Sequence, residues 1–155
     1  QALARHVLDH PETVAQKRVI DLAAGSGLVA IAAMKAGATS VLAAEIDAFA
    51  VAAIQLNATT NGVAVEAAER DLLTEAVPEA DVILVGDLFY DRDLAPRVLA
   101  WLIDCQAQGK TVLIGDPGRT YLPRDKLEQI AAYDIPVSRA LEDCELKRAA
   151  VWRLR

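Results

Sequence analysis

The chain has 155 residues, 54% of them hydrophobic, and a formal net charge of −6 at pH 7. This length fits one domain with a full core, and the hydrophobic fraction favours an α/β sheet whose strands are buried on both faces. The acidic balance argues against a nucleic-acid partner, and no apolar run approaches the ~18 residues needed to cross a membrane.

Helical and extended patterns alternate along the chain, with short breaks between them. Apolar spacing predicts helices over residues 2–9, 28–36, 48–60, 94–108 and 123–133. Apolar runs predict strands over residues 18–22, 40–45, 63–69, 81–86 and 111–115. Two further extended runs, 135–141 and 146–154, flank Glu142–Glu145 and are typical of a hairpin. In the second run, Ala149 and Val151 share one face, and Trp152 and Leu154 share the other.

We therefore expect an α/β fold. It is a Rossmann-like, seven-stranded, mostly parallel sheet with a C-terminal antiparallel hairpin and helices on both faces. Residues 1–155 are expected to form a single domain. The chain opens at Gln1, without methionine and already inside a helical pattern, which suggests that an upstream segment has been cut away.

The first predicted strand ends in a carboxylate and runs into a glycine loop, Asp21 to Gly27. Glycines let a backbone turn tightly and approach a ligand, and the following helix offers free N–H groups. Gly25 to Ala30 fit the dinucleotide fingerprint G-x-G-x-x-A. However, Asp21 would repel a pyrophosphate and suits a cationic amino or sulfonium group. S-adenosylmethionine carries both groups and no phosphate, so we expect it to be the cofactor.

An acidic side chain follows each of the five predicted parallel strands. These residues are Asp21, Glu45 with Asp47, Asp71, Asp87 and Asp116. Ligands of open α/β sheets bind beyond the carboxyl ends of the strands, so all are candidate ligand contacts. The alternative for any one of them is a helix cap or a turn residue.

Two of these acids suit a nucleoside. Glu45 lies 18 residues after Gly27, near the ~20-residue spacing at which a carboxylate meets ribose hydroxyls. Asp71 could accept a hydrogen bond from an adenine amino group. The expected cofactor contacts are Asp21, Ala23, Gly25, Ser26, Gly27, Glu45, Ile46, Asp71 and Leu72.

The segment Asp87-Leu88-Phe89-Tyr90 follows the most apolar predicted strand. A lysine amine is mostly protonated near neutrality, since its reference pKa is about 10.4. A carboxylate and an aromatic face can capture the ammonium, and desolvation then favours the neutral amine. We expect Asp87 and Tyr90 to be catalytic, with Asp87 orienting the acceptor nitrogen or helping its proton leave, and Phe89 to contact the substrate. The alternative is that Phe89 and Tyr90 only cover the sheet edge.

Other chemistries find little support. His6 and His10 lie one helical turn apart, but no third ligand converges on them, so no metal is expected. Cys105 and Cys144 show no C-x-x-C spacing and fit a reduced interior, in the cytoplasm or, for a eukaryote, in the mitochondrial matrix. The phosphate-binding pattern G-x-x-x-x-G-K-[ST] is absent.

Together these motifs resemble the class I S-adenosylmethionine-dependent methyltransferases. Asp21-x-Ala23-x-Gly25-x-Gly27 is similar to their glycine-rich first motif, with alanine where many members have the first glycine. Glu45 and Asp71 fall where that class binds ribose and adenine. Asp87-Leu88-Phe89-Tyr90 resembles the D-x-x-Y motif of its family 16 group, which is rich in protein lysine methyltransferases.

Two segments resemble more specifically the electron transfer flavoprotein β-subunit lysine methyltransferases and their bacterial relatives. They are Ala23-Ala24-Gly25-Ser26-Gly27-Leu28-Val29-Ala30 and Gly115-Asp116-Pro117-Gly118-Arg119. The resemblance covers nearly the whole chain. It implies methylation of lysines on a folded protein partner, with Asp116 and Arg119 as neighbours of the substrate.

The sequence departs from the family at two points. Relatives usually carry an aromatic, glycine-containing segment just before the position of Gln1, so we expect part of the substrate or cofactor cover to be absent from this chain. There is no Asn-Pro-Pro-Tyr after the fourth strand, which counts against methylation of DNA or of glutamine amides. Small-molecule N-methylation, an NAD-dependent oxidoreductase and a non-catalytic cofactor-binding module remain alternatives. No apolar stripe demands a dimer, so we expect a monomer.

Overall fold

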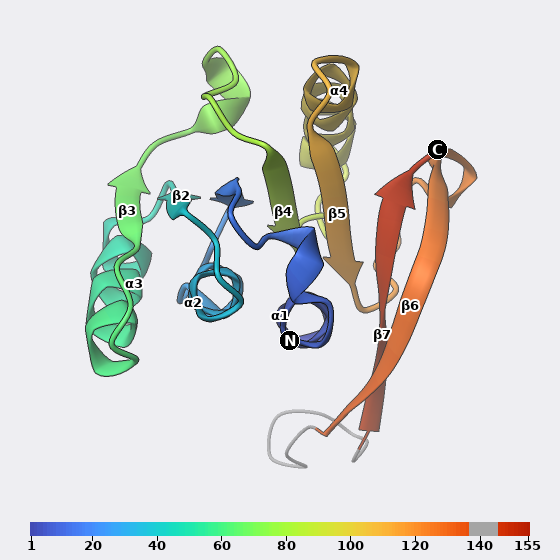
Figure 1. Cartoon of the computed structure of the whole chain (residues 1–155). Coiled ribbons are helices and arrows are strands. Elements are labelled where there is room, and N and C mark those ends of the chain that lie inside the picture. The colour runs from blue at the N-terminus through green and yellow to red at the C-terminus, as the bar shows by residue number, and fades with distance from the viewer. Residues whose placement is uncertain (137–145) are drawn as a thin grey trace.

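The structure is a computed structural model, and it describes residues 1–136 and 146–155. Seven strands form one sheet in the order β3-β2-β1-β4-β5-β7-β6 (Figure 1). The bounds are β1 (Arg18–Leu22), β2 (Ser40–Glu45), β3 (Glu66–Glu69), β4 (Val82–Gly86), β5 (Thr111–Asp116), β6 (Leu127–Pro136) and β7 (Leu146–Leu154). The strands β1 to β5 pair in parallel, whereas β7 runs antiparallel to β5 and β6. The expected sheet is confirmed.

Within the described residues, four α-helices cover the two faces of the sheet. They are α1 (Ala2–Asp9), α2 (Leu28–Lys35), α3 (Ala48–Thr60) and α4 (Leu94–Ala107). The first three lie on one face and α4 lies on the other (Figure 1). The buried side chains divide in the same way, because Leu102 of α4 belongs to one core cluster and Leu3 of α1 to a second. The strands β1 and β4 are almost wholly buried, as expected for the centre of a parallel sheet.

The helix predicted from Pro123 to Tyr133 is wrong. Residues Arg124–Lys126 form a short 3-10 turn (η3), and β6 begins at Leu127. Leu127, Ile130 and Ala131 have the three- and four-residue spacing of a helix, but pairing with β7 holds them extended. A β-bulge between Gln129 and Ala131 interrupts that pairing. It places Leu127 against the α4 face and Ala131 against the α1 face.

The predicted hairpin is confirmed in part. The second run is β7, and its face assignment holds, because Val151 packs with the α1 cluster and Leu154 with the α4 cluster. In the first run, residues 135 and 136 belong to β6. Residues 137–141 and the predicted turn Glu142–Glu145 lie outside the described residues.

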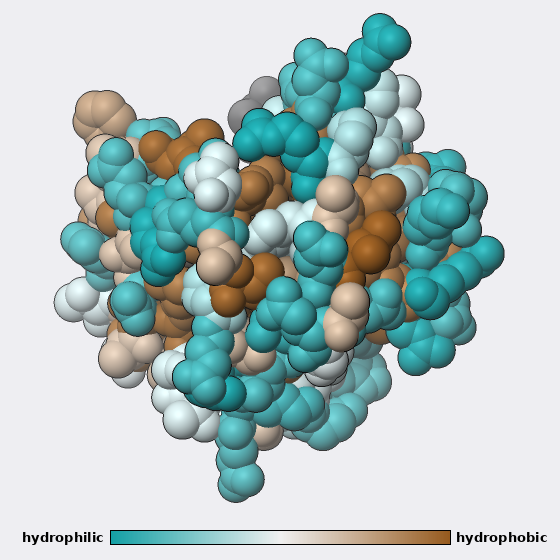
Figure 2. All heavy atoms as spheres, turned by 90° about the horizontal axis from the view of Figure 1, so that it is seen from above, coloured by the Kyte–Doolittle hydropathy of each residue, from teal (hydrophilic) through white to brown (hydrophobic). Residues whose placement is uncertain are grey.

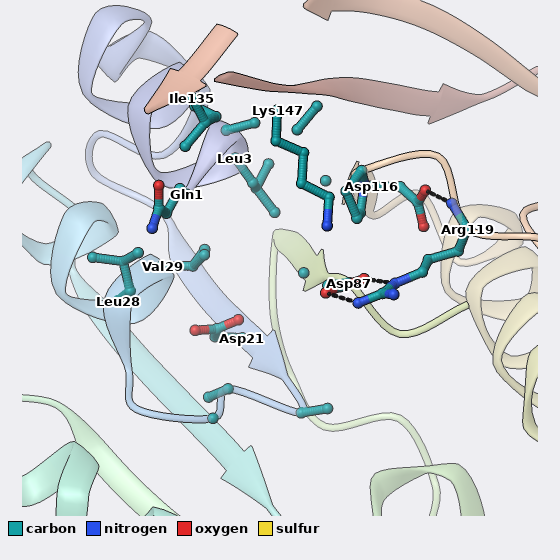
Figure 3. Close-up of a pocket in the computed structure, with 18 residues that line it drawn as sticks. Gln1, Leu3, Asp21, Leu28, Val29, Asp87, Asp116, Arg119, Ile135 and Lys147 are labelled. Atoms are coloured by element: carbon teal, nitrogen blue, oxygen red, sulfur yellow. Dashed lines mark hydrogen bonds and ion pairs between the residues drawn. The ribbon is translucent and has the colours of Figure 1, made fainter. Parts of the chain in front are cut away.

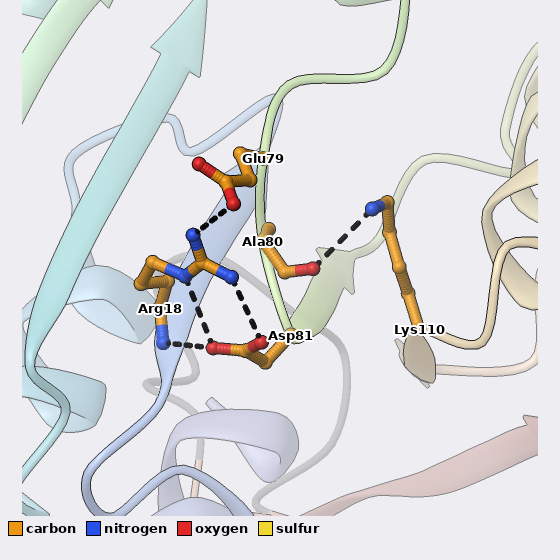
Figure 4. Close-up of polar contacts among 5 residues, drawn as sticks. All are labelled: Arg18, Glu79, Ala80, Asp81 and Lys110. Carbon is orange, nitrogen blue, oxygen red and sulfur yellow. Dashed lines mark hydrogen bonds and ion pairs between the residues drawn. The ribbon is translucent and has the colours of Figure 1, made fainter.

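Charged contacts fix the amino-terminal edge of the sheet, opposite the glycine loop. Arg18 contacts Asp81 and Glu79, which precede β4, and its backbone N–H also donates to Asp81 Oδ2 at 2.8 Å (Figure 4). Lys110, just before β5, donates to the carbonyl of Ala80 at 3.3 Å. These contacts tie together the starts of β1, β4 and β5, so that their carboxyl ends emerge side by side.

The surface seen from above in Figure 2 is mostly hydrophilic, with hydrophobic residues in separate patches. Several large apolar side chains are nevertheless exposed, including Phe49 at 88% and Ile46 at 71%. Within residues 1–136 and 146–155, no helix combines the length and apolarity required to cross a bilayer.

Candidate functional site

The glycine loop after β1 adopts backbone conformations that few residues tolerate. Ala23, Gly25 and Gly27 have φ values of +53°, +55° and +82°. A Cβ on Gly27 would lie 3.1 Å from Cγ2 of Ile54, so side-chain packing as well as conformation requires glycine there. A Cβ on Gly25 would meet nothing within 4 Å. The loop therefore leaves open space above Gly25, where a ligand can approach the backbone.

Asp21 lies in β1 beneath this loop and is almost fully buried. Its Oδ2 accepts a hydrogen bond of 2.9 Å from the N–H of Ala30 in the first turn of α2. Burial raises the pKa of Asp21 to about 7, and the neighbouring Glu45 acts in the same direction. A cation bound above the loop would favour the ionised form of this carboxyl.

Glu45, the last residue of β2, reaches across to the same loop. Its Oε2 accepts from the N–H of Gly25 at 2.9 Å, and its Oε1 accepts from the N–H of Ile46 at 2.8 Å. Both oxygens are thus held at the carboxyl edge of the sheet. An ionised carboxylate in this position can accept bonds from the two hydroxyls of a ribose.

A cavity of about 370 Å³ opens beyond the carboxyl ends of β1, β4 and β5 (Figure 3). Helices α1 and α2 and strands β6 and β7 also contribute to its walls. Its lining includes apolar side chains from α1 and α2 together with several ionisable side chains. The charged members are Asp21, Asp87, Asp116, Arg119 and Lys147.

Asp87 follows β4 and has a left-handed backbone, with φ +54°. Its carboxylate accepts two hydrogen bonds from the guanidinium of Arg119, at 2.6 and 2.8 Å (Figure 3). Asp tolerates this backbone conformation better than most non-glycine residues, but it still costs free energy, and such residues recur at functional sites. Asp87 is therefore held at the cavity by its backbone conformation and by its ion pair with Arg119.

Asp116 ends β5 and is also buried. Its Oδ1 accepts from the N–H groups of Gly118 and Arg119, at 2.6 and 2.7 Å, which closes the turn after β5. Among the described residues its Oδ2 has no hydrogen-bond partner, although it too is buried. Burial raises the pKa of Asp116, while the two backbone hydrogen bonds lower it. An unpaired buried acceptor is costly and suits a donor from a ligand.

A second cavity, of about 270 Å³, lies on the other side of Asp87. The predicted residues Glu45, Ile46, Asp71, Leu72 and Tyr90 line it. Gly86, Ala23 and Asp87 line both cavities. Seven of the nine predicted cofactor residues thus line one or both of two adjoining cavities, which meet at the ends of β1 and β4, whereas Ser26 and Gly27 line neither.

Some predicted site residues lie elsewhere. Phe89 is fully buried in the α4 core cluster and lines neither of these two cavities. Ser26 is exposed, and its carbonyl accepts a hydrogen bond from Asn57. Asp47 caps α3 by accepting from the N–H of Phe49 at 2.8 Å. Asp71 caps a 3-10 turn in a similar way, but it remains on the second cavity.

The sequence reasoning missed cavity residues outside the strand ends. Leu3 of α1 and Lys147 of β7 line the first cavity, and Arg97 of α4 lines the second. A signal existed for Lys147, because in a strand it shares its face with Ala149 and Val151. No comparable signal identifies Leu3. Within the part of the chain that the structure describes, no three His, Cys, Asp or Glu side chains are grouped to hold a metal ion.

Comparison with known proteins gives one family match, over residues 3–88, to the family described as ribosomal protein L11 methyltransferase (PrmA). The electron transfer flavoprotein β-subunit lysine methyltransferase of Rattus norvegicus is 40% identical over 158 residues. That alignment covers 98% of this chain and 62% of the relative. The chain thus spans less than two thirds of the length of this relative.

Solved structures share the fold at lower identity. The ribosomal protein L11 methylase of Lactobacillus delbrueckii subsp. bulgaricus is 22% identical, with a TM-score of 0.64 over 99% of this chain and 78% of that one. A tRNA (uracil-54, C5)-methyltransferase of Pyrococcus abyssi, solved in complex with S-adenosyl-L-homocysteine, is 15% identical, with a TM-score of 0.67. It covers 97% of this chain and 37% of that one.

Proposed function

The chain belongs to the ribosomal protein L11 methyltransferase (PrmA) family, and from this premise we propose that it transfers a methyl group from S-adenosylmethionine to a lysine side chain of a protein. The family match ends at residue 88, whereas similarity to the electron transfer flavoprotein β-subunit lysine methyltransferases extends over 98% of the chain. We therefore take the β subunit of electron transfer flavoprotein as the first candidate substrate.

The residues present fit S-adenosylmethionine. Asp21 offers a buried carboxylate to a cationic group in the first cavity, and Glu45 offers two acceptor oxygens to a diol at the second. Gly25 leaves the backbone open between them. When bound, this cofactor supplies an electrophilic methyl group on a positively charged sulfur.

One observation carries the proposed role of the site: Asp87 lines both cavities. The second cavity is lined by the residues expected to bind the nucleoside, and Asp87 lies where it adjoins the first. The methyl donor and the acceptor amine would meet at such a position. The Asp87 carboxylate can accept a hydrogen bond from the acceptor amine and orient its lone pair. It can also hold the proton that the ammonium must lose before it reacts. Tyr90, which is 58% exposed at the second cavity, can act as a wall for the bound groups.

The surroundings of the cavities support a protein partner. Large apolar side chains are exposed near their rims, including Leu28 at 47% and Ile46 at 71%. The net charge of −6 favours a neutral or basic partner surface. We propose that the protein acts as a monomer, in the cytoplasm or, in a eukaryote, in the mitochondrial matrix. The buried thiol of Cys105 suits such a reducing compartment.

The test is methyl transfer with defined acceptors. The chain is incubated with S-adenosylmethionine and, in separate reactions, with electron transfer flavoprotein β subunit, with ribosomal protein L11 and with a protein-free metabolite extract. Lysine methylation of the first acceptor, located by peptide mass spectrometry, is the expected result. Methylation of L11 alone would make L11 the substrate in place of the electron transfer flavoprotein β subunit. Methyl groups found only in metabolites would favour small-molecule N-methylation. Binding of S-adenosylhomocysteine without any transfer would indicate a non-catalytic module.

A further inference from the structure

A lysine of the chain itself points into the first cavity. Lys147 extends from β7 past Leu3, and its amine nitrogen lies on the side of the cavity formed by Asp87 and Asp116 (Figure 3). The residue is half-buried. Neither the glycine loop nor the segment after β4 contributes it, so it is separate from the predicted machinery.

The strand register explains why this side chain reaches the site. In the β5–β7 pair, Asp116 at the end of β5 lies opposite Ala150. Lys147 lies three residues before Ala150 in the chain, in the part of β7 that extends beyond the carboxyl end of β5. Alternation places it on the face of Ala149 and Val151, which packs towards α1. A long charged side chain on this apolar face extends over the strand ends into the cavity.

The carboxylates that line the same cavity as this amine are those that the proposed acceptor lysine would need. Asp87 is the carboxylate assigned to the acceptor, and Asp116 presents a buried oxygen without a hydrogen-bond partner among the described residues. We propose that Lys147 occupies the acceptor position and is itself methylated, by the active site of its own chain. This inference rests on the proposed methyltransferase function.

The chemistry balances without any further reactant. The Lys147 ammonium first loses a proton to water or to the Asp87 carboxylate. The lone pair of Nζ then forms a bond to the methyl carbon of the sulfonium donor. The carbon–sulfur bond breaks, and its electron pair stays on sulfur to give the neutral thioether S-adenosylhomocysteine. The methylated amine carries the positive charge, so that the total charge is conserved.

An acceptor within the same chain has a kinetic signature. Intramolecular methylation is first order, so the fraction of Lys147 methylated per unit time is independent of protein concentration. Methylation between chains would instead slow in proportion to dilution. We expect the fractional rate to change less than about twofold over a 20-fold dilution, at a saturating concentration of S-adenosylmethionine.

The experiment follows Lys147 and a protein acceptor in the same tube. The full chain is incubated with S-adenosylmethionine and the electron transfer flavoprotein β subunit, and the peptides of both are analysed by mass spectrometry. We expect a gain of methyl groups at Lys147, none at the exposed Lys126, and no gain at position 147 in Lys147→Arg. Lys126→Arg is the matched control, because Lys126 lies on η3 and lines neither cavity.

A second measurement does not depend on turnover. Acylation by an amine-reactive acetyl ester is followed at Lys147 and Lys126, with and without S-adenosylhomocysteine. We expect the ligand to slow acylation of Lys147 severalfold and to leave Lys126 unchanged. Equal reactivity of Lys147 in both conditions would overturn its placement beside the bound ligand.

The outcomes separate the two proposals. Methylation of the protein acceptor while Lys147 stays unmodified overturns this inference and leaves the proposed function intact. A rate at Lys147 that falls 20-fold on 20-fold dilution also overturns it. Absence of methyl transfer to every acceptor, despite binding of S-adenosylhomocysteine, overturns the proposed function and this inference with it. Methylation of Lys147 alone supports the inference and rejects only the choice of substrate.

Discussion

Arg119 holds Asp87 through two parallel hydrogen bonds, from Nε to Oδ1 at 2.6 Å and from Nη2 to Oδ2 at 2.8 Å. The guanidinium comes from the turn after β5 and the carboxylate from the residue after β4, so the pair joins these two segments in the lining of the first cavity. Both side chains remain nearly half exposed, at 40% and 47%. An exposed ion pair contributes about 1 kcal/mol or less, so a substrate amine can take over one of the carboxylate oxygens.

Asp87→Asn is expected to lower kcat at least about 100-fold, because the amide can neither hold a proton nor attract the ammonium as strongly. Arg119→Ala is expected to lower kcat by tenfold or less, since it only loosens the orientation of Asp87. In the double variant the Arg119 change should add no further loss, because its effect passes through Asp87. Methyl transfer rates measure these changes in kcat. Calorimetric titration with S-adenosylhomocysteine is the control, and the Kd of each of the three variants should stay within about threefold of the parent value. Full activity in Asp87→Asn would reject the catalytic assignment.

The buried carboxyl of Asp21 should make stability depend on pH. Its folded-state pKa is about 7, above the ordinary value of 3.8, so the folded state keeps a proton that the unfolded chain has lost. Stability contributed by this group is complete below about pH 4 and is lost as the pH rises to 7, with a slope of at most about 1.4 kcal/mol per pH unit. Asp21→Asn stays neutral and should be clearly more stable than the parent at pH 8 and nearly equal at pH 4.

Urea denaturation of both proteins at pH 4, 6 and 8, without ligand, measures this difference. Taking the difference between the two proteins removes the titration of other groups, such as Asp116, whose pKa is also raised by burial. The same Asp21→Asn variant should bind S-adenosylhomocysteine more weakly at pH 8, because the ligand's amino group loses its carboxylate partner. A pH-independent difference in stability would show that Asp21 does not titrate in this range.

The central sheet could be predicted from the sequence because its signals are local. The apolar run of β4 and the loop from Asp21 to Gly27 fix strand, turn and helix within a few residues. The gathering of acids at the cavities could be predicted for the same reason, since parallel strands deliver their ends to one edge. The strand β6 was missed because its structure comes from pairing with β7, and a bulge beside Ile130 disturbs its alternation.

The remaining parts of the site depend on packing between distant segments. The Asp87–Arg119 pair joins residues 32 positions apart, and Lys147 reaches the cavity through the register of an antiparallel pair. Spacing along the chain does not predict the Asp87–Arg119 pair, and for Lys147 it gives only the face of the strand, not the cavity that the side chain enters. The sequence does not decide whether Phe89 is buried, because an aromatic residue after a strand can face either the core or a ligand. In the structure Phe89 faces the core.

Glu45→Gln should weaken binding of S-adenosylhomocysteine by about 10- to 100-fold, because hydrogen bonds to a charged acceptor contribute about 1.5–3 kcal/mol. The amide oxygen can still accept from the N–H of Gly25, so the loop should stay folded, while the bond from the N–H of Ile46 is lost because the amide nitrogen cannot accept. Glu66→Gln is the matched control, since Glu66 is exposed at the start of β3 and lines neither cavity. Calorimetric titration measures both Kd values. Equal affinities for the two variants would remove Glu45 from the ligand site.

Ala23→Gly should stabilise the protein by up to about 1 kcal/mol. Ala23 has φ +53°, a conformation that costs a residue with a Cβ about 1–2 kcal/mol, whereas glycine adopts it freely. The greater chain entropy of glycine in the unfolded state offsets part of this gain. Ala24→Gly is the control: Ala24 is not among the residues with positive φ, and the change there should destabilise by about 0.5–1 kcal/mol. If urea denaturation shows equal losses for both variants, the left-handed backbone at Ala23 carries no strain. A gain at Ala23 alone would explain why many methyltransferases of this class have glycine at this position.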